Sequence, residues 1–367
     1  MTTKTTAAVV HEAGAPFVLE SVELDEPRPD EALVRMVATG LCHTDLSAQA
    51  GALPFPLPGV LGHEGAGVVE KTGADVRSVV PGDHVLASFS SCGVCPQCRS
   101  GRPAYCSHFH SLNLFGGARR DGSHTILQGG EPLHGHFFGQ SSLARHALMD
   151  ERSLVRVPKD APLAILAPLG CGIQTGAGAV LNALRPEAGA ALAVFGTGAV
   201  GCAAIMAAAL SGVARIVAVD LVPARLELAR ELGATDTVDA SRVDPVAALR
   251  ELGGGMDYVV EATGSTAALS QAIRTLAPRG TCAILSTYPH GATVPLDVNF
   301  MIDGRRVVGV SEGDSEPQRF VPALASLFEQ GRLPIDRLIR HYPFEEIEQA
   351  AADARAGVTI KPVLIFD

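Results

Sequence analysis

The sequence predicts an α/β protein with one β-rich domain and a second domain built on a doubly wound parallel sheet. Two observations predict this fold class. The chain has 367 residues, more than one ordinary hydrophobic core accommodates, so two domains are expected. The first third of the chain contains short apolar runs broken by turn residues, whereas strand-like and helix-like segments alternate after Cys171.

The first third predicts mainly strands. Apolar runs that end near Gly, Pro or Asp occur at residues 9–10, 17–22, 32–38, 67–71 and 84–87. Short strands at such spacing are typical of a compact, barrel-like β domain. Residues 107–140 are rich in Gly, His and Phe, and we expect a long loop or lobe there that helps to shape a pocket.

The residues after 171 predict βαβ units, which build a parallel sheet. The expected strands are 190–195, 215–219, 237–238, 257–261 and 281–286, and the expected helices are 199–210, 223–232, 245–252 and 266–276. From about residue 311 the pattern returns to helix and short strands, ending in an apolar run at 363–366. We therefore expect a first domain of residues 1–172 and 311–367, with a nucleotide domain of residues 173–310 inserted into it.

Composition excludes several function classes. The 29 Lys and Arg residues are outnumbered by 39 Asp and Glu residues, which gives a net charge of −10, and no basic run suggests nucleic-acid binding. No apolar run has the length and composition of a membrane span, and the first residues lack the features of a signal peptide. Eight cysteines without a secretory signal indicate the reducing cytoplasm, where thiolates bind metals instead of pairing.

A glycine-rich turn predicts a dinucleotide site. The run G-T-G-A-V-G, with glycines at 196, 198 and 201, follows an expected strand and opens an expected helix. Asp220 ends the next strand at about the ~20-residue distance of a ribose-binding carboxylate. Such a carboxylate repels a 2′-phosphate and favours NAD over NADP, and Arg225 would contact the ribose edge or a 2′-phosphate. The alternative is a glycine-rich turn that binds no ligand.

Six cysteines and one histidine form two patterns typical of zinc sites. Cys92, Cys95, Cys98 and Cys106 follow the spacing C-x-x-C-x-x-C-x7-C, and four thiolates close a tetrahedral shell, as in structural zinc sites. The second set comprises Cys42, His63 and Cys171, whose three donors leave a fourth position open for chemistry. The alternative for each set is ordinary packing residues of a core.

With these motifs the chain resembles the zinc-dependent medium-chain alcohol dehydrogenases over its whole length. The matching residues are C-H-T-D at 42–45, G-H-E-x-x-G at 62–67, L-G-C-G at 169–172, the four-cysteine run, and the glycine turn with Asp220. The resemblance implies a GroES-like catalytic domain and a Rossmann nucleotide domain. The runs F-F-G-Q-S-S-L-A at 137–144 and G-V-S-E-G-D-S at 309–315 are similar to the aryl- and allyl-alcohol branch, such as benzyl alcohol and geraniol dehydrogenases.

The resemblance also implies roles for individual residues. Cys42, His63 and Cys171 would hold a catalytic zinc, with Glu64 beside it as an exchangeable ligand. Asp45 would orient His63, and Thr44 would accept the proton of the substrate hydroxyl while hydride passes to NAD. The residues implied at the cofactor and substrate are His43 and Lys361 at the pyrophosphate, Thr175 and Val200 at the nicotinamide, and Phe89 in the substrate channel.

Three of these roles have an alternative that the sequence leaves open. Thr175 could be a helix-facing residue, Val200 a core residue and Phe89 an ordinary strand residue. Two positions also depart from many relatives. Ser47 stands where many have a His that completes the proton relay, and His43 stands where some have an Arg against the pyrophosphate.

The resulting expectation is an NAD-linked enzyme with two zinc ions per chain that interconverts primary, aromatic or allylic, alcohols and aldehydes. One alternative is a dehydrogenase for thiol adducts of formaldehyde on the same fold. Another is a binding or structural protein that has kept the fold and lost the chemistry. The family further implies a homodimer or homotetramer and small-molecule substrates.

Overall fold

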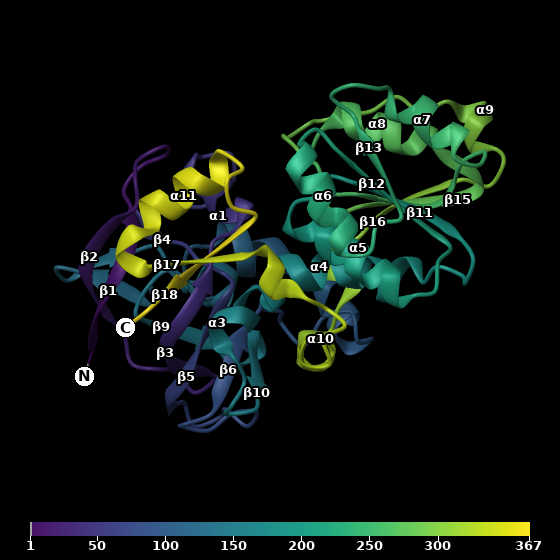
Figure 1. Cartoon of the computed structure of the whole chain (residues 1–367). Helices are drawn as coiled ribbons and strands as arrows, with labels where there is room; N and C mark the ends of the chain where they lie inside the picture. Colours follow the sequence, from purple (N-terminus) through teal and green to yellow (C-terminus); the bar gives the residue numbers. More distant parts are fainter. Residues whose placement is uncertain (1) are drawn as a thin grey trace. The chain divides into compact units, whose positions relative to one another are not determined.

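The computed structural model describes residues 2–367, and these form two units whose segments interleave along the sequence (Figure 1). The first unit comprises the chain up to Cys171, Glu316–Ser326 and Ile335–Asp367. The second unit comprises Gly172–Ser315 and Leu327–Pro334. The predicted fold class, a β-rich domain joined to a parallel-sheet α/β domain, is confirmed by the two sets of sheets described next.

The first unit contains two sheets of largely antiparallel strands. One sheet has the order β4-β1-β2-β7-β8, and its strands are Gly59–Val60, Thr3–Val10, Val18–Leu24, Ile126–Gln128 and Glu131–Leu133. The other has the order β10-β6-β5-β3-β18-β17, with strands Leu154–Val157, His84–Ala87, Gly65–Thr72, Glu31–Gly40, Lys361–Ile365 and Ile339–Pro343. Strand β9 (His146–Asp150) also pairs with β3.

Strand β3 is central to the second of these sheets. Its sequence E-A-L-V-R-M-V-A-T-G is buried at eight of ten positions, as a strand covered on both faces requires. It pairs with β5 along one side and with both β9 and β18 along the other. Pairing with this buried central strand therefore fixes the positions of the strands that begin or end near the candidate site.

The expectation that residues 107–140 form a long loop or lobe is wrong in part. Strands β7 and β8 form a hairpin there, and β7 pairs with β2 to extend the first sheet. The hairpin turns at Gly129 and Gly130, which both adopt positive φ (59° and 86°) as a tight two-residue turn requires. The rest of the region includes a short helical turn at Ser111–Phe115.

The helices that lie wholly or partly in the first unit have the following bounds: α1 His43–Gln49, α2 Pro96–Arg99, α3 Leu163–Leu166, α10 Pro317–Glu329 and α11 Ile347–Arg355. Helix α10 continues beyond Ser326 into the segment that belongs to the second unit. Helix α1 was not expected from the sequence. Asp45 in its first turn accepts a hydrogen bond from the backbone N–H of Cys42, which satisfies a donor at the start of the helix.

The second unit is a six-stranded parallel sheet of order β13-β12-β11-β14-β15-β16. The strands are Asp236–Asp239, Arg215–Asp220, Ala191–Phe195, Met256–Glu261, Leu276–Ile284 and Arg306–Gly309. The helices are α4 Gly172–Gly178, α5 Ala199–Leu210, α6 Pro223–Glu231, α7 Pro245–Glu251, α8 Thr266–Arg274 and α9 Val298–Met301. In Figure 1, α7 and α8 lie together along one face of the sheet and α5 along the other.

This strand order is the doubly wound order 3-2-1-4-5-6, in which the order of strand addition reverses between β11 and β14 while all strands stay parallel. Ligands of such sheets bind at the carboxyl ends of the strands beside that reversal. The G-T-G-A-V-G turn lies at the carboxyl end of β11, so it occupies the position where a dinucleotide binds in this fold.

Candidate functional site

Four donor side chains from distant parts of the sequence meet inside the first unit. The candidate ligand atoms of Cys42, His63, Glu64 and Cys171 all lie within 4.8 Å of one another. Cys42 precedes helix α1, His63 and Glu64 precede strand β5, and Cys171 follows a short helical turn at Ala167–Gly170. His63 and Glu64 are fully buried.

Asp45 fixes the orientation of the His63 ring. The Nδ1 of His63 donates to Oδ1 of Asp45 at 2.9 Å, because a carboxylate can only accept. The same carboxylate accepts from the backbone N–H of Gly62 at 3.0 Å and of Cys42 at 2.9 Å. With the proton on Nδ1, the Nε2 of His63 presents its lone pair.

That Nε2 atom is buried and has no hydrogen-bond partner among residues 2–367. A buried polar atom without a partner costs free energy, about 1–3 kcal/mol. A nitrogen lone pair beside two cysteine sulfurs is the donor set that zinc prefers. The residues present therefore fit a metal ion of this kind.

Two aromatic rings pack against the imidazole of His63. Phe138 stacks on the imidazole with ring centroids 4.5 Å apart and an interplanar angle of 24°, and Phe137 meets it edge-on at 5.5 Å. Phe138 has a positive φ of 53°, which is rare for an aromatic residue and marks a locally strained turn. The ring orientation of His63 is thus set by Asp45 and by these two phenylalanines.

Lys361 lies in this cluster and binds Glu64. Its Nζ donates to Oε1 and Oε2 of Glu64 at 2.8 and 3.0 Å, and both side chains are buried. A Cβ atom at Gly40 would lie 1.9 Å from Oε2 of Glu64, so only glycine leaves room for the carboxylate. The sequence-based expectation placed Lys361 at a pyrophosphate; in the structure its ammonium group is instead engaged by Glu64.

The electrostatics of the cluster reflect burial and opposite charges. Burial raises the pKa of Glu64 to about 7, and the Lys361 charge only partly offsets this effect. Burial opposes the charged form of Lys361, but Glu64 and Cys42 outweigh it and raise the pKa of Lys361 above its usual value. The hydrogen bond from Cys171, assisted by Lys361, lowers the pKa of Cys42 well below that of a free thiol.

The four cysteines of the C-x-x-C-x-x-C-x7-C run also converge. The sulfurs of Cys92, Cys95, Cys98 and Cys106 lie within 4.8 Å of one another. Backbone N–H groups donate to three of them: Cys95 N to Cys92 Sγ, Cys98 N to Cys95 Sγ, and Cys92 N to Cys106 Sγ. The N–H of Cys98 is the main reason that the pKa of Cys95 falls to about 5, which favours a thiolate.

A third cluster of potential ligand residues, formed by Glu31, His136 and Asp150, is a structural network. Both oxygens of Glu31 accept from Arg119, at 2.7 and 2.8 Å, so this carboxylate is committed to an ion pair. His136 Nε2 lies 3.1 Å from Asp150, whose other oxygen accepts from Ser90 at 2.6 Å. Burial opposes protonation of His136, but the carboxylate of Asp150 outweighs it, so the pKa of His136 is raised.

In the second unit, the glycine turn leaves a cradle at the start of helix α5. Gly196 has a φ of 87°, and a Cβ at Gly201 would lie 1.8 Å from the carbonyl oxygen of Gly196, so both positions require glycine. A Cβ at Gly198 would meet no other atom of the described chain within 4 Å, apart from its own neighbours. The side of the turn at Gly198 is therefore open, as the approach of a pyrophosphate requires.

Asp220 ends β12 beside this turn. Its Oδ2 accepts from the backbone N–H and hydroxyl of Thr197, at 2.7 and 2.8 Å, which fixes the carboxylate against the glycine turn. Arg225 is partly buried, and its Nε has no hydrogen-bond partner in the part of the chain that the structure describes. Of the residues expected at the nicotinamide, Thr175 is buried in α4 and Val200 is partly buried in α5.

Both units of the structure match domains of known protein families. Residues 28–159 match the alcohol dehydrogenase GroES-like domain, and residues 199–329 match the zinc-binding dehydrogenase domain. The chain is also 42% identical to geraniol dehydrogenase of Castellaniella defragrans over 98% of its own length and 97% of the relative's. The chain belongs to the zinc-binding alcohol dehydrogenase family.

Solved structures of this alcohol dehydrogenase family agree with the fold. An alcohol dehydrogenase zinc-binding domain protein from Burkholderia ambifaria is 52% identical, with a TM-score of 0.98 and complete coverage of both chains. Benzyl alcohol dehydrogenase of Acinetobacter calcoaceticus is 44% identical, with a TM-score of 0.96 and the same coverage. The sequence-based assignment to the aryl- and allyl-alcohol branch of alcohol dehydrogenases is confirmed by these relatives, and the protein is an oxidoreductase.

Two residues expected at the alcohol dehydrogenase site differ in exposure. His43 is exposed in the first turn of α1. Phe89 is only 2% exposed and packs against Phe109, with ring centroids 5.7 Å apart. The sequence predicts no site role for Phe138 or Gln140, although both lie in the F-F-G-Q-S-S-L-A run.

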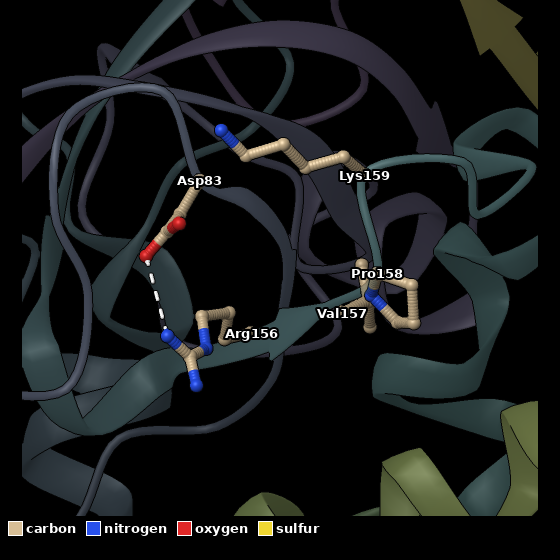
Figure 2. Close-up of a pocket in the computed structure, with 5 residues that line it drawn as sticks. All are labelled: Asp83, Arg156, Val157, Pro158 and Lys159. Atoms are coloured by element: carbon tan, nitrogen blue, oxygen red, sulfur yellow. Dashed lines mark ion pairs between the residues drawn. The ribbon is translucent and has the colours of Figure 1, made fainter.

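A surface pocket of the first unit lies between Asp83 and residues 156–159 (Figure 2). Asp83 and Arg156 form an ion pair, 3.9 Å apart, on one side of it, and the side chain of Lys159 extends toward Asp83. None of the predicted ligands lines this pocket, so we assign it no part in the chemistry of the alcohol dehydrogenase.

Within residues 2–367, no single helix is long and apolar enough to cross a membrane. The two helical segments Leu163–Gly170 and Gly172–Leu184, which are bent against each other by 59°, have sufficient length and apolar composition only when they are taken together.

Proposed function

We propose that this alcohol dehydrogenase interconverts primary aromatic or allylic alcohols and their aldehydes, with NAD as the hydride acceptor. The relatives support the substrate class, because one is named for geraniol, an allylic alcohol, and another for benzyl alcohol. The single observation that carries the proposal is the buried Cys42–His63–Cys171 cluster with the partnerless Nε2 of His63.

We propose two zinc ions per chain. Cys42, His63 and Cys171 would hold the catalytic ion, with Glu64 adjacent, and the four cysteines 92, 95, 98 and 106 would hold the structural ion. When bound, the first ion supplies a Lewis acid for the substrate oxygen, and NAD supplies the hydride acceptor. The shell of four thiolates has no open position and serves the fold.

The chain's own residues would position the donors and move the proton. Asp45 keeps the proton of His63 on Nδ1, so that Nε2 stays available as a donor. Thr44, whose Oγ1 lies 3.8 Å from the sulfur of Cys42, would accept the proton of the substrate hydroxyl at that oxygen. Ser47 is a poor base, so we expect the proton to leave this region through water instead of a side chain.

In the nucleotide domain, the turn of Gly196, Gly198 and Gly201 would receive the pyrophosphate at the start of α5. Asp220 would accept from the ribose hydroxyl groups and would repel a 2′-phosphate, which supports NAD over NADP. Because Lys361 is bound to Glu64, we assign its charge to the zinc cluster, and we propose His43 for the pyrophosphate. Thr175, Val200 and Arg225 remain proposed cofactor contacts, and Phe89 a proposed substrate contact.

We further propose a homo-oligomer, dimer or tetramer, in the cytoplasm. Strand β16 is at the edge of the parallel sheet, and Val298 and Ile302 in the preceding segment are 73% and 77% exposed. An open edge beside exposed apolar side chains is typical of a subunit contact. No disulfide joins any of the eight cysteines, all of which lie within the described residues, and this suits a reducing compartment.

The alternative activity on thiol adducts of formaldehyde is not favoured, because two relatives that cover the chain are named for geraniol and benzyl alcohol. One experiment separates the two activities: NADH absorbance with benzyl, cinnamyl, geranyl and short aliphatic alcohols, and with formaldehyde plus thiol. We expect the first three alcohols to be the best substrates. Turnover only with formaldehyde and thiol would overturn the assignment.

Metal content tests the proposed site directly. We expect two zinc ions per wild-type chain and one in Cys171→Ala, which should also lose alcohol oxidation. Cys282→Ala is the matched control, because Cys282 is a buried thiol in the other unit, and it should retain both ions. A fully metallated wild-type protein with only one zinc, or an active Cys171→Ala variant, would refute the proposal.

A further inference from the structure

Gln140 is a buried side chain whose amide joins three backbone groups near the candidate zinc ligands. It is 1% exposed and lies in the F-F-G-Q-S-S-L-A segment, two residues after the second of the two phenylalanines that contact His63. Its Nε2 donates to the carbonyl oxygens of His63 and Ser88, both at 3.0 Å. Its Oε1 accepts from the backbone N–H of Gly65 at 3.2 Å.

The hydrogen bond from Gln140 gives the carbonyl oxygen of His63 a partner that the sheet does not provide. Strand β5 begins at Gly65, so the backbone of His63 lies outside the ladder that β5 forms with β3. A buried carbonyl outside a ladder needs a side chain or water as its partner. Gln140 provides that partner and binds the N–H of Gly65 on the other side of Glu64, so it holds the main chain on both sides of this residue.

The hydrogen bond to Ser88 connects the same amide to the other ligand segment. Ser88 directly follows strand β6, and its hydroxyl donates to the carbonyl oxygen of Gly170 at 2.7 Å. Gly170 lies against this point so closely that a Cβ there would be 1.9 Å from the carbonyl oxygen of Ala87. Cys171 is the next residue, so its backbone position depends on this contact.

We infer that Gln140 is a positioning residue that sets the separation of His63 and Cys171. The connection runs from the His63 carbonyl through the Gln140 amide to the Ser88 carbonyl, and from the Ser88 hydroxyl to Gly170. This inference rests on the proposed zinc site, because only a metal shared by His63 and Cys171 makes their separation matter to function. Residues that support metal ligands in this way typically change metal affinity about 10–100-fold when they are replaced.

The test compares Gln140→Met with a matched control, Asn113→Leu. Both changes replace a buried amide by an apolar side chain of similar size. Asn113 is fully buried and makes the same set of bonds: it accepts from the backbone N–H of Ser90 and donates to the carbonyl oxygens of Ser90 and Phe109. It differs from Gln140 in having no bond to the backbone of His63, Gly65 or Ser88.

The measurements are the affinity for Zn²⁺ itself, by competition with a chromophoric chelator, and the visible spectrum of the Co²⁺-substituted protein. In Gln140→Met we expect the zinc affinity of the Cys42–His63–Cys171 site to fall about 10–100-fold and the cobalt bands to shift. In Asn113→Leu we expect both properties to stay as in wild type. Ser88→Ala is a milder change, and it should alter both properties in the same direction as Gln140→Met.

The double variant Gln140→Met/Ser88→Ala should lose no more zinc affinity than Gln140→Met alone, because both changes break one connection. Wild-type zinc affinity and cobalt spectrum in Gln140→Met would overturn the inference, as would an equal loss of zinc in Asn113→Leu. A wild-type chain that binds one zinc only would instead refute the proposed function on which the inference rests. The two failures are therefore distinguishable.

Discussion

Replacing Asp45 by Asn tests whether the carboxylate is needed to hold His63 as a zinc donor. In the structure, Oδ1 accepts from His63 Nδ1 and Gly62 N, and Oδ2 accepts from Cys42 N. An asparagine has one oxygen and one NH₂ group, so its NH₂ must face at least one of these N–H donors. Whichever way the amide turns, at least one hydrogen bond becomes a repulsive contact.

The expected effect is a 10–100-fold loss of zinc affinity at this site, about 1.4–2.8 kcal/mol. The assay is zinc content per chain after dialysis against a chelator of graded strength. The four-cysteine site is an internal reference, so the content should fall from two ions to one and not to zero. Asp83→Asn is a matched control, since Asp83 is a buried carboxylate that accepts from the N–H of Val80 away from the cluster.

The reasoning is refuted if Asp45→Asn keeps both zinc ions against the same chelator strength as wild type. It is also refuted if Asp83→Asn loses zinc to the same extent, because the effect would then follow from any lost buried carboxylate.

Three other predictions concern charged groups. Lys361→Met should destabilise the protein by about 3–5 kcal/mol in urea unfolding, because it removes the positive charge that compensates the buried carboxylate of Glu64, and adding Glu64→Gln should recover much of that loss. The raised pKa of His136 means that its pairing with Asp150 contributes stability below pH ~6.5 and loses it as pH rises through the higher folded-state value. His136→Asn should therefore remove this pH dependence of the urea midpoint, and an unchanged profile would contradict the assignment. Asp220→Ala should weaken NADH binding about tenfold or more in a fluorescence titration without weakening NADPH binding, because charged hydrogen bonds contribute about 1.5–3 kcal/mol.

The nucleotide domain could be predicted from the sequence because its signals are local. The helix expected at residues 199–210 is found at Ala199–Leu210, since a buried strand, a glycine turn and an uninterrupted apolar segment follow one another. The strand expected at 281–286 begins earlier in the structure, at Leu276. The sequence does not indicate this earlier start, because Pro278 and Gly280 are typical turn residues, although here they continue the strand. The run of four cysteines was equally local, and the structure brings its sulfurs together.

The surroundings of His63 could not be predicted in the same way, because they depend on residues far apart in sequence. Lys361 was expected near a phosphate, yet its partner Glu64 is 297 residues away. A lysine followed by P-V-L-I gives no indication that its charge is buried. The hairpin at residues 126–133 did carry a usable signal, the adjacent glycines 129 and 130, but its strands are only three residues long.

The place of β18 in the sheet also constrains how the protein is made. This strand lies between β3 and β17, yet the ribosome synthesises it after the whole parallel-sheet domain. A nascent chain can complete the nucleotide domain largely from contiguous segments, whereas β3 must wait for a partner from much later in translation. Until then, the carboxylate of Glu64 lacks the ammonium group that neutralises it, so the last step of assembly closes the sheet and balances the charge at the metal-binding cluster together.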